Sequence, residues 1–387
     1  MPRRLKSSFN LAEIDLKAFS HNYQTMASLA PEALMAVIKG DAYGHGLVEC
    51  AKAAIKAGAN DLGVLDLEEA LTIRKELNEA NIHVLAGLHG PDQAARAISA
   101  GLTIFGYSLG QMTQLSHTAL KLGSQAKIMV KIDTGMGRLG LPWDQSHVLL
   151  SEVAVLEGLK IQGLATHLAT LGDQGALEQL ERFRQIVRIA DKSFKGPLRH
   201  SALSGGALLC HSVYPDNVVR AGLTLYGYGP TLDYLKSVKA PPKALETAEA
   251  LKPVMKVKSQ IIQVREIKAG ETISYDRTFV ASKEATVATV PFGYVHGLSR
   301  TRSSKGYILI NGQKAPLLGR VCMNLSVYDV TNLKAKAGDE VVILGEVAEN
   351  IIGADLIAQW SNTSPYEVLC LLGRLNPRLY LGLKSDS

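Results

Sequence analysis

Short apolar runs alternate with helix-like stretches through the first 230 residues of the chain. The runs cover residues 34–39, 61–66, 82–88, 102–107, 127–133, 160–167, 198–204 and 218–226. Between most of them apolar residues recur three and four positions apart, as in 51–57, 67–77 and 177–189, which predicts amphipathic helices. Repeated strand–helix units imply parallel strands, and eight of them favour a closed (β/α)8 TIM-type barrel. Periodicity alone leaves an open doubly wound sheet as the alternative.

The pattern changes after residue 235. Residues 235–253 hold Pro241-Pro242 and Pro253 around a polar, alanine-rich segment, which predicts a connection between domains. Farther on, the runs 256–258, 261–264, 285–290 and 339–344 predict strands, and Ser364-Pro365-Tyr366-Glu367 predicts the start of a final helix. We therefore predict an α/β chain with a barrel domain over residues 1–240 and a mostly-β C-terminal domain over 241–387.

Composition narrows the function classes. The net charge is +6 and the pI about 9.0, yet Lys and Arg are scattered among Asp and Glu without a basic stripe, so anionic small molecules fit better than nucleic acid. The cysteines are too widely spaced for a metal motif, and we predict no metal site. No apolar run suits a signal peptide or a membrane span, so we expect a cytoplasmic enzyme.

Polar side chains follow the apolar runs. Lys39 stands where the first run meets a glycine-rich turn, a place that suits a Schiff-base lysine, which must shed its proton despite a usual pKa near ~10.4. The fifth run ends in Lys131-Ile132-Asp133 and is followed by Arg138, and the sixth run ends in His167. Ser204-Gly205-Gly206 stands at the end of the seventh run, and Arg220-Ala221-Gly222 lies within the eighth. Because the carboxyl ends of barrel strands meet on one rim, we predict an active site there.

Three segments carry a family resemblance that extends from about Asn10 to Tyr380. Ala36–Gly46, Val219–Gly222 followed by Leu225-Tyr226-Gly227, and Ile273–Phe279 together resemble the alanine racemases. The resemblance implies a two-domain isomerase with pyridoxal 5'-phosphate (PLP) on Lys39. It also implies a homodimer that interconverts L- and D-alanine, and so supplies D-alanine for peptidoglycan of the cell wall.

The resemblance also implies roles for single residues. The PLP phosphate would be held by residues matching the family's phosphate ligands, namely Tyr43, Ser204, Gly222, Leu223 and Tyr366. Arg220 would face the pyridine nitrogen, and since a guanidinium pKa exceeds ~12 it would leave that nitrogen without a proton. Arg138 would hold the substrate carboxylate, and Lys131 would be carbamylated to orient it.

Racemisation needs a base on each face of the α-carbon. Lys39 is one, and the resemblance makes Tyr275 the other, delivered with Met323 by the partner subunit. Ionising a tyrosine at neutral pH costs about 4 kcal/mol without nearby positive charge, which we expect His167 and Arg220 to supply.

The chain departs from the family pattern at three acidic positions. His296 and Asn324 stand where aspartate is usual, and Asp173 lies one place later than the usual acid after His167. These changes leave a preference for serine or a basic amino acid open.

Two other classes of protein fit the sequence less well. A non-catalytic PLP-carrier protein would resemble the barrel alone, without Tyr275, and a decarboxylase on this plan would pair the pyridine nitrogen with an acid instead of Arg220.

Overall fold

The computed structural model describes residues 9–30, 32–194, 196–211 and 218–382. The chain forms two compact units. The larger comprises Phe19–Ala42 and Leu47–Lys252, and the smaller comprises the described residues up to Ala18, Tyr43–Gly46 and the chain from Pro253 onward. Helix α11 (Pro242–Ala250) belongs to the larger unit although it follows the predicted boundary at residue 240, and strand β1 (Leu11–Asp15) belongs to the smaller one.

The larger unit is built on a ring of parallel strands. In spatial order they are β10 (Val218–Ala221), β2 (Ala33–Val37), β3 (Asp61–Val64), β4 (Asn81–Val84), β5 (Thr103–Gly106), β6 (Ala126–Asp133), β8 (Leu159–Ala165) and β9 (Arg199–Ser201). Every predicted run overlaps one of them. The ring closes where the Arg220 N–H donates to the Leu203 carbonyl at 3.0 Å. The predicted barrel is confirmed, and the open sheet is not formed.

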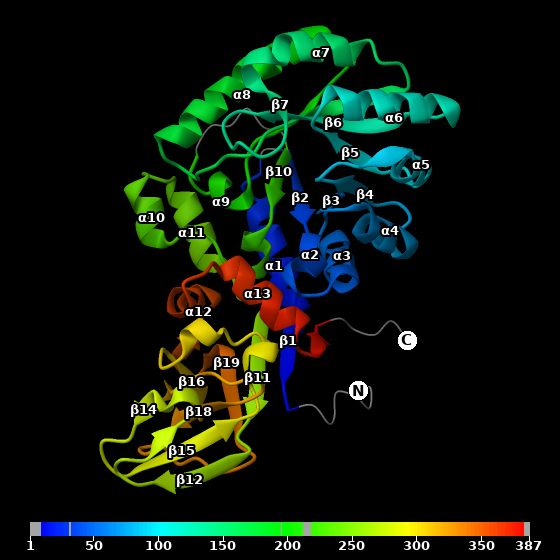
Figure 1. Cartoon of the computed structure of the whole chain (residues 1–387). Helices are drawn as coiled ribbons and strands as arrows, with labels where there is room; N and C mark the ends of the chain where they lie inside the picture. Colours follow the sequence, from blue (N-terminus) through cyan, green and yellow to red (C-terminus); the bar gives the residue numbers. More distant parts are fainter. Residues whose placement is uncertain (1–8, 31, 195, 212–217, 383–387) are drawn as a thin grey trace. The chain divides into compact units, whose positions relative to one another are not determined.

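Helices cover the outside of this ring (Figure 1). They are α1 (Leu16–Ala27), α3 (Leu47–Lys56), α4 (Leu67–Glu76), α5 (Gly90–Ser99), α6 (Leu109–Lys121), α7 (Ser146–Ala154), α8 (Gln174–Ser193), α9 (Gly205–Leu208), α10 (Leu232–Ser237) and α11. Strands covered in this way are buried on both faces, as β3 is along its whole length. The segment predicted as a connection is partly helical, because Pro242 occupies a first-turn position of α11 where its missing N–H costs nothing.

The smaller unit is a mostly antiparallel sheet with two helices. Its strands are β1, β11 (Met255–Gln260), β12 (Gln263–Ile267), β15 (Ala285–Val290), β16 (Tyr307–Ile310), β17 (Gln313–Leu318), β18 (Ser326–Asp329), β19 (Glu340–Val347), β20 (Asn350–Ile352) and β21 (Arg378–Leu381). The predicted β-rich domain is confirmed. The helices are α12 (Ala354–Ser361) and α13 (Pro365–Arg374), and α13 begins where predicted, with the Ser364 hydroxyl accepting from the Glu367 N–H at 3.4 Å.

A separate hairpin of the smaller unit carries one predicted base. Strands β13 (Thr272–Ile273) and β14 (Phe279–Val280) pair with each other and flank Tyr275. Ile273 is buried in an apolar cluster with Ile267, Val287 and Leu318. Packing therefore anchors both ends of the segment that presents Tyr275.

Candidate active site

Lys39 follows β2 and opens a left-handed turn. The backbone φ angles of Gly40, Asp41 and Ala42 are 66°, 58° and 53°. Non-glycine residues in this conformation cost roughly 1–2 kcal/mol each, so the turn must be held by its neighbours. The Asp41 carboxylate accepts from the Leu47 N–H at 2.9 Å, and the Asp41 N–H donates to Glu69 at 2.9 Å. Such imposed strain is typical of functional sites.

Arg220 and His167 meet at the carboxyl ends of β10 and β8. Nη1 of Arg220 donates to the Ser201 carbonyl at 2.7 Å, and Nη2 donates to the Thr166 carbonyl at 2.7 Å and to Nδ1 of His167 at 3.2 Å. Backbone carbonyls thus fix the guanidinium while it stays charged. Because Nδ1 of His167 accepts, the neutral imidazole carries its proton on Nε2.

His167 is neutral in this setting. Burial, followed by the positive charges of Arg220, Lys131, Arg138 and Lys39, lowers the pKa of His167 to about 2. The prediction that His167 supplies positive charge is therefore wrong. Arg220 supplies the charge, and His167 offers an N–H donor.

Arg138 brings more positive charge to this rim, and Lys131 lies beside it. Burial, and then the neighbouring Arg220 and Arg138, lower the pKa of Lys131 well below its usual value, while Asp133 opposes the shift. Asp133 itself is engaged by the loop. Its carboxylate accepts from the N–H groups of Gly135 at 2.9 Å and Arg138 at 3.1 Å. Burial would raise the pKa of Asp133, but these N–H donors outweigh burial and lower it.

The turns after β9 and β10 lie against each other. A Cβ on Gly205 would come within 2.3 Å of the Thr224 hydroxyl and 3.3 Å of Cα of Ala221, so only glycine permits this approach. Ser204 caps α9, and Gly222 precedes the short helical turn η2 (Leu223–Tyr226). The first N–H groups of such turns have no acceptor within the turn.

These turns fit a phosphate group. The buried Thr224 hydroxyl has no hydrogen-bond partner in the described part of the chain. Together with the N–H groups at the start of the two turns and the close glycine approach, it offers hydrogen-bond donors to an anion. The residues present therefore fit the phosphate of PLP.

Tyr275 lies in a strained and exposed loop of the smaller unit. Ser274 and Asp276 on either side have φ angles of 66° and 59°, and the Tyr275 side chain is 63% exposed. Asp276 pairs with Arg320 at 2.6 Å, and the Ser274 hydroxyl donates to the Arg320 carbonyl at 2.6 Å. The loop is thus fixed in shape while its phenol faces solvent.

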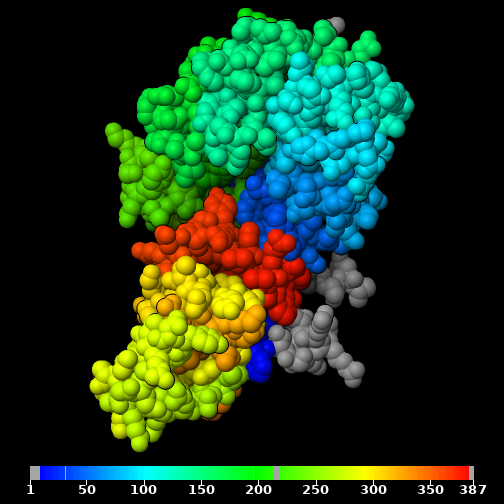
Figure 2. Space-filling view, in the orientation of Figure 1, coloured from blue at the N-terminus to red at the C-terminus, as the bar shows by residue number. Residues whose placement is uncertain are grey.

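Met323 follows a residue that contacts this loop, since Sγ of Cys322 lies 3.3 Å from the Ser274 hydroxyl. It is 55% exposed, and its carbonyl accepts from the Val295 N–H at 3.1 Å, beside the half-exposed Tyr294. In the space-filling view the yellow segment near residue 295 borders the red segment of α13 (Figure 2). At this border the Asn376 amide donates to the His296 carbonyl at 2.9 Å.

Tyr43 and Tyr366 also lie together in the smaller unit. Their ring centroids are 5.8 Å apart at an interplanar angle of 42°. The backbone permits this because Gly44 packs directly on α13, where a Cβ would come within 2.7 Å of the Leu369 carbonyl. Both predicted phosphate ligands of this unit therefore belong to one cluster.

The departures from the family pattern have local structural roles. Nδ1 of His296 accepts from the Gly293 N–H at 3.1 Å, as an aspartate could, and burial lowers the pKa of His296 and keeps it neutral. Asp173 caps α8 by accepting from the Ala176 N–H at 3.0 Å. Asn324 is exposed.

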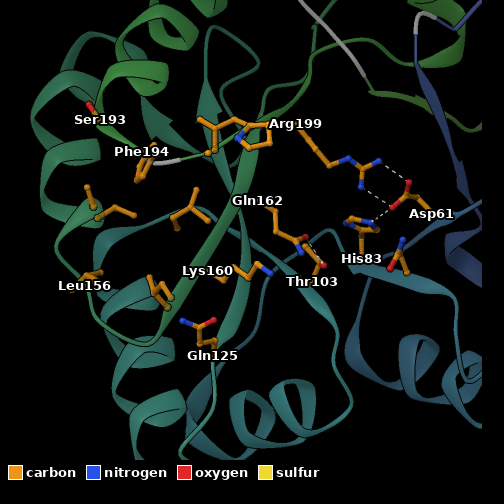
Figure 3. Close-up of a pocket in the computed structure, with 18 of the residues that line it drawn as sticks. Asp61, His83, Thr103, Gln125, Leu156, Lys160, Gln162, Ser193, Phe194 and Arg199 are labelled. Atoms are coloured by element: carbon orange, nitrogen blue, oxygen red, sulfur yellow. Dashed lines mark hydrogen bonds and ion pairs between the residues drawn. The ribbon is translucent and has the colours of Figure 1, made fainter.

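A polar cavity of about 960 Å³ lies at the other end of the barrel, where β3, β4, β5, β8 and β9 begin. Arg199 donates to both carboxylate oxygens of Asp61 at 2.8 and 2.6 Å, and Nε2 of His83 contacts Asp61 at 2.8 Å (Figure 3). Thr103 donates to Gln162 at 3.0 Å. Its central charges satisfy one another, and none of the predicted site residues lines it.

The structure thus brings together the predicted residues of the carboxyl rim, while Tyr43, Tyr275, Met323 and Tyr366 lie in the smaller unit. Sequence reasoning missed the residues that hold the loops, namely Asp41, Glu69 and Gln179. A glutamate or glutamine within a helix gives no signal of its own. The aspartate after Lys39-Gly40 could have been recognised, since Asp favours turns.

Comparison with known proteins identifies relatives along the whole chain. The model of the alanine racemase N-terminal domain matches residues 14–230, and that of the C-terminal domain matches residues 254–380. Alanine racemase 2 of Caldanaerobacter subterraneus subsp. tengcongensis is 36% identical over 377 residues, which cover 95% of this chain and 94% of that protein. The alanine racemase of Geobacter sulfurreducens is 34% identical over 96% of this chain and 97% of its own length.

Solved structures agree with the sequence relatives. The alanine racemase from D-cycloserine-producing Streptomyces lavendulae superposes with a TM-score of 0.89 at 31% identity and covers 97% of this chain and 98% of its own. The alanine racemase from Bartonella henselae, solved with covalently bound pyridoxal phosphate, has a TM-score of 0.84 at 27% identity over 97% of this chain and 100% of its own. Within the described residues, no helix is long and apolar enough to cross a membrane.

Proposed function

This chain belongs to the alanine racemase family of amino-acid racemases, and from that premise we propose that it interconverts L- and D-alanine with PLP held on Lys39. The observation that carries the proposal is the carboxyl rim of the barrel. Several cationic groups crowd there around a neutral His167, and the nearest carboxylate is already engaged by backbone N–H groups. A site of this kind suits a substrate and a cofactor that both carry negative charge.

PLP would be held by residues of the barrel rim and by two tyrosines. Nζ of Lys39 would bind its aldehyde, the turns at Ser204 and Gly222–Leu223 with Tyr43 and Tyr366 would bind its phosphate, and Arg220 would face its pyridine nitrogen. When bound, PLP withdraws electrons from the bond between the α-carbon and its hydrogen. The fixed guanidinium of Arg220 cannot readily give up a proton, so it limits this withdrawal and disfavours transamination.

Two bases would exchange the α-proton. Nζ of Lys39 takes or returns it on one face, and the phenolate oxygen of Tyr275 does so on the other. His167 would donate its Nε2–H to that phenolate, because its Nδ1 is occupied by Arg220. The chain from Tyr275 through His167 to Arg220 would thereby lower the cost of ionising the phenol.

Arg138 would bind the substrate carboxylate, and Lys131 would orient it. The lowered pKa of Lys131 leaves a neutral, nucleophilic amine. This amine would attack the carbon of CO2 and release a proton to water, giving a carbamate. The new negative charge would pair with Arg138.

A homodimer would complete each site with Tyr275 and Met323 of the partner chain. The exposure of both side chains, and the imposed strain around Tyr275, support this arrangement. In cells such an enzyme would work in the cytoplasm and supply D-alanine for peptidoglycan.

Mixed dimers test the shared site. Lys39→Ala and Tyr275→Phe chains each keep at most about a hundredth of wild-type activity as homodimers under this proposal. In a mixed dimer one site would contain both intact bases, so co-expression should restore about a quarter of wild-type activity, as expected for random pairing of chains in a two-fold dimer. No recovery in dimers shown to be mixed would contradict the shared site.

Borohydride reduction tests the cofactor. The protein purified with PLP should lose activity on reduction, and peptide mapping should find the pyridoxyl group on Lys39. The Lys39→Arg variant should carry no such label. Labelling elsewhere, or none, would remove PLP attachment at Lys39 from the account.

A further inference from the structure

One buried glutamine connects the two loops that carry the cationic rim. Gln179 projects from α8 and is 4% exposed. We propose that Gln179 is a positioning residue that aims His167 at the base Tyr275. This inference rests on the two-base function proposed above.

The amide of Gln179 contacts both loops at once. Its Oε1 accepts from the Ala169 N–H at 2.8 Å, which fixes Nε2 on the opposite side. Nε2 then donates to the His167 carbonyl and to the Thr134 hydroxyl, each at 3.2 Å. The loop after β8 is held at two points, and the loop after β6 at one.

Further contacts make this connection rigid. The hydroxyls of Thr134 and Thr166 lie 2.8 Å apart and are fully buried. One turn along α8, Arg182 donates to the Thr134 carbonyl at 2.9 Å and stacks over Trp143 at 5.0 Å. The loop ends of β6 and β8 therefore form one block with α8.

His167 is consequently fixed from two sides. Gln179 holds its carbonyl, and Arg220 holds its ring at Nδ1. These two anchors define the direction of the Nε2–H. Without the Gln179 contact the peptide at His167 can rotate while Arg220 still holds the ring, so the N–H turns away from its target. Small displacements of this kind slow proton transfer strongly.

The test compares isotope effects for the two antipodes of alanine, each deuterated at the α-carbon. Gln179→Met removes all three contacts without adding charge, and Gln179→Glu keeps the acceptor for Ala169 but loses the donors. Gln185→Met on the exposed face of α8 is the matched control. Tyr275→Phe serves as the reference, because it slows transfer on the Tyr275 side alone.

Slower transfer on one side has a signature that loss of folded protein cannot imitate. The isotope effect rises for the antipode whose proton Tyr275 removes, and it falls for the other antipode, because the Lys39 step then limits the rate less. We expect Tyr275→Phe, Gln179→Met and Gln179→Glu to shift both isotope effects in these opposite senses. Gln179→Met should also lower kcat about tenfold, which is less than the roughly 10² to 10⁴-fold contribution of a general base, because Tyr275 itself remains. Gln185→Met should match wild type.

The outcomes separate the two proposals. If Tyr275→Phe gives the signature and the Gln179 variants lose activity with unchanged isotope effects, Gln179 only stabilises the fold and this inference is overturned. If Tyr275→Phe gives no opposite shifts, the two-base function itself fails, and the inference fails with it.

Discussion

The two ends of the barrel carry similar side chains and treat their charges in opposite ways. At the amino end Arg199 and His83 share the carboxylate of Asp61. At the carboxyl end burial and the neighbouring Arg220 lower the pKa of Lys131, and Asp133 is occupied by its own loop. The charges at the amino end are therefore paired within the protein, whereas we predict that the carboxyl end gains stability when an anion binds.

This contrast agrees with the division of labour in barrels, where stability resides at the amino end and chemistry at the carboxyl end. It also separates two effects of mutation. Substitutions at the amino end should reduce stability and spare turnover. Substitutions at the carboxyl end should reduce turnover and spare or improve stability.

The largest effect on activity is expected at Lys39. Lys39→Ala removes both the cofactor attachment and one base, so kcat should fall by more than the roughly 10² to 10⁴-fold of a single general base. The free energy of unfolding should change little, because Lys39→Ala only removes one positive charge from a rim where several cationic groups already lie close together. Racemisation assays and urea denaturation of the same preparation measure both. A large loss of stability would erase the contrast between the ends.

The largest effect on stability is expected at Asp61. Asp61→Asn leaves Arg199 without its carboxylate and should cost about 3 kcal/mol, the lower part of the range for a broken buried pair, since Arg199 is partly exposed. Turnover of the folded protein should stay at the wild-type value. Asp144→Asn, at an exposed position, is the control.

The same pair predicts a pH dependence. Burial would raise the pKa of Asp61, but hydrogen bonds from Arg199 and His83 outweigh it and hold that pKa well below its usual value. The ionised pair therefore stabilises the fold above the unfolded pKa of about 4, and this contribution fades as the pH falls below it. The Asp61→Asn variant should lack this part of the acid limb in denaturation curves.

Lys131→Met should lower activity and spare stability, the reverse of Asp61→Asn, and its effect should be smaller. It removes a buried amine from beside two guanidinium groups, so the melting temperature should stay level or rise. Loss of the carbamate that we propose on Lys131 should lower kcat/KM about tenfold. Mass spectrometry of the wild-type protein under bicarbonate should show the added CO2 on Lys131. A fall in melting temperature with unchanged activity would reverse the roles of the two ends.

Anion binding should give the smallest effect. Inorganic phosphate should stabilise the PLP-free protein by about 1.4 kcal/mol at tenfold excess over its Kd. The stabilisation should persist in Asp61→Asn, because the amino end has no uncompensated charge. Equal stabilisation by chloride at the same ionic strength would show screening rather than binding.

The fold could be predicted from the sequence because strands that are buried on both faces appear as continuous apolar runs. Each predicted run overlaps a barrel strand, since helices cover the outer face of these strands and side chains of the barrel interior cover the inner face. The segment around Pro242 was harder. Paired prolines indicate a break, yet one of them occupies a helix start, and tertiary packing retained α11 in the larger unit.

The site could be predicted in its reactive groups but not in its supports. Lys39, His167 and Arg220 stand at strand ends, and strand order brings such ends together. The neutral state of His167 depends on its burial and then on the charges that surround it in space, and no local sequence pattern reveals either. Gln179 lies in α8, whereas the residues it holds lie in the loops after β6 and β8, so only the packed structure shows its contacts.

The central claim is that the carboxyl rim exchanges the α-proton of alanine between two faces. The most direct measurement is a chiral assay in deuterium oxide, with purified protein, PLP and single amino acids including L-alanine, L-serine and L-lysine. The account predicts that L-alanine yields D-alanine carrying deuterium at the α-carbon, without pyruvate or CO2. Failure of every amino acid to racemise, or release of CO2 in place of the other antipode, would contradict it.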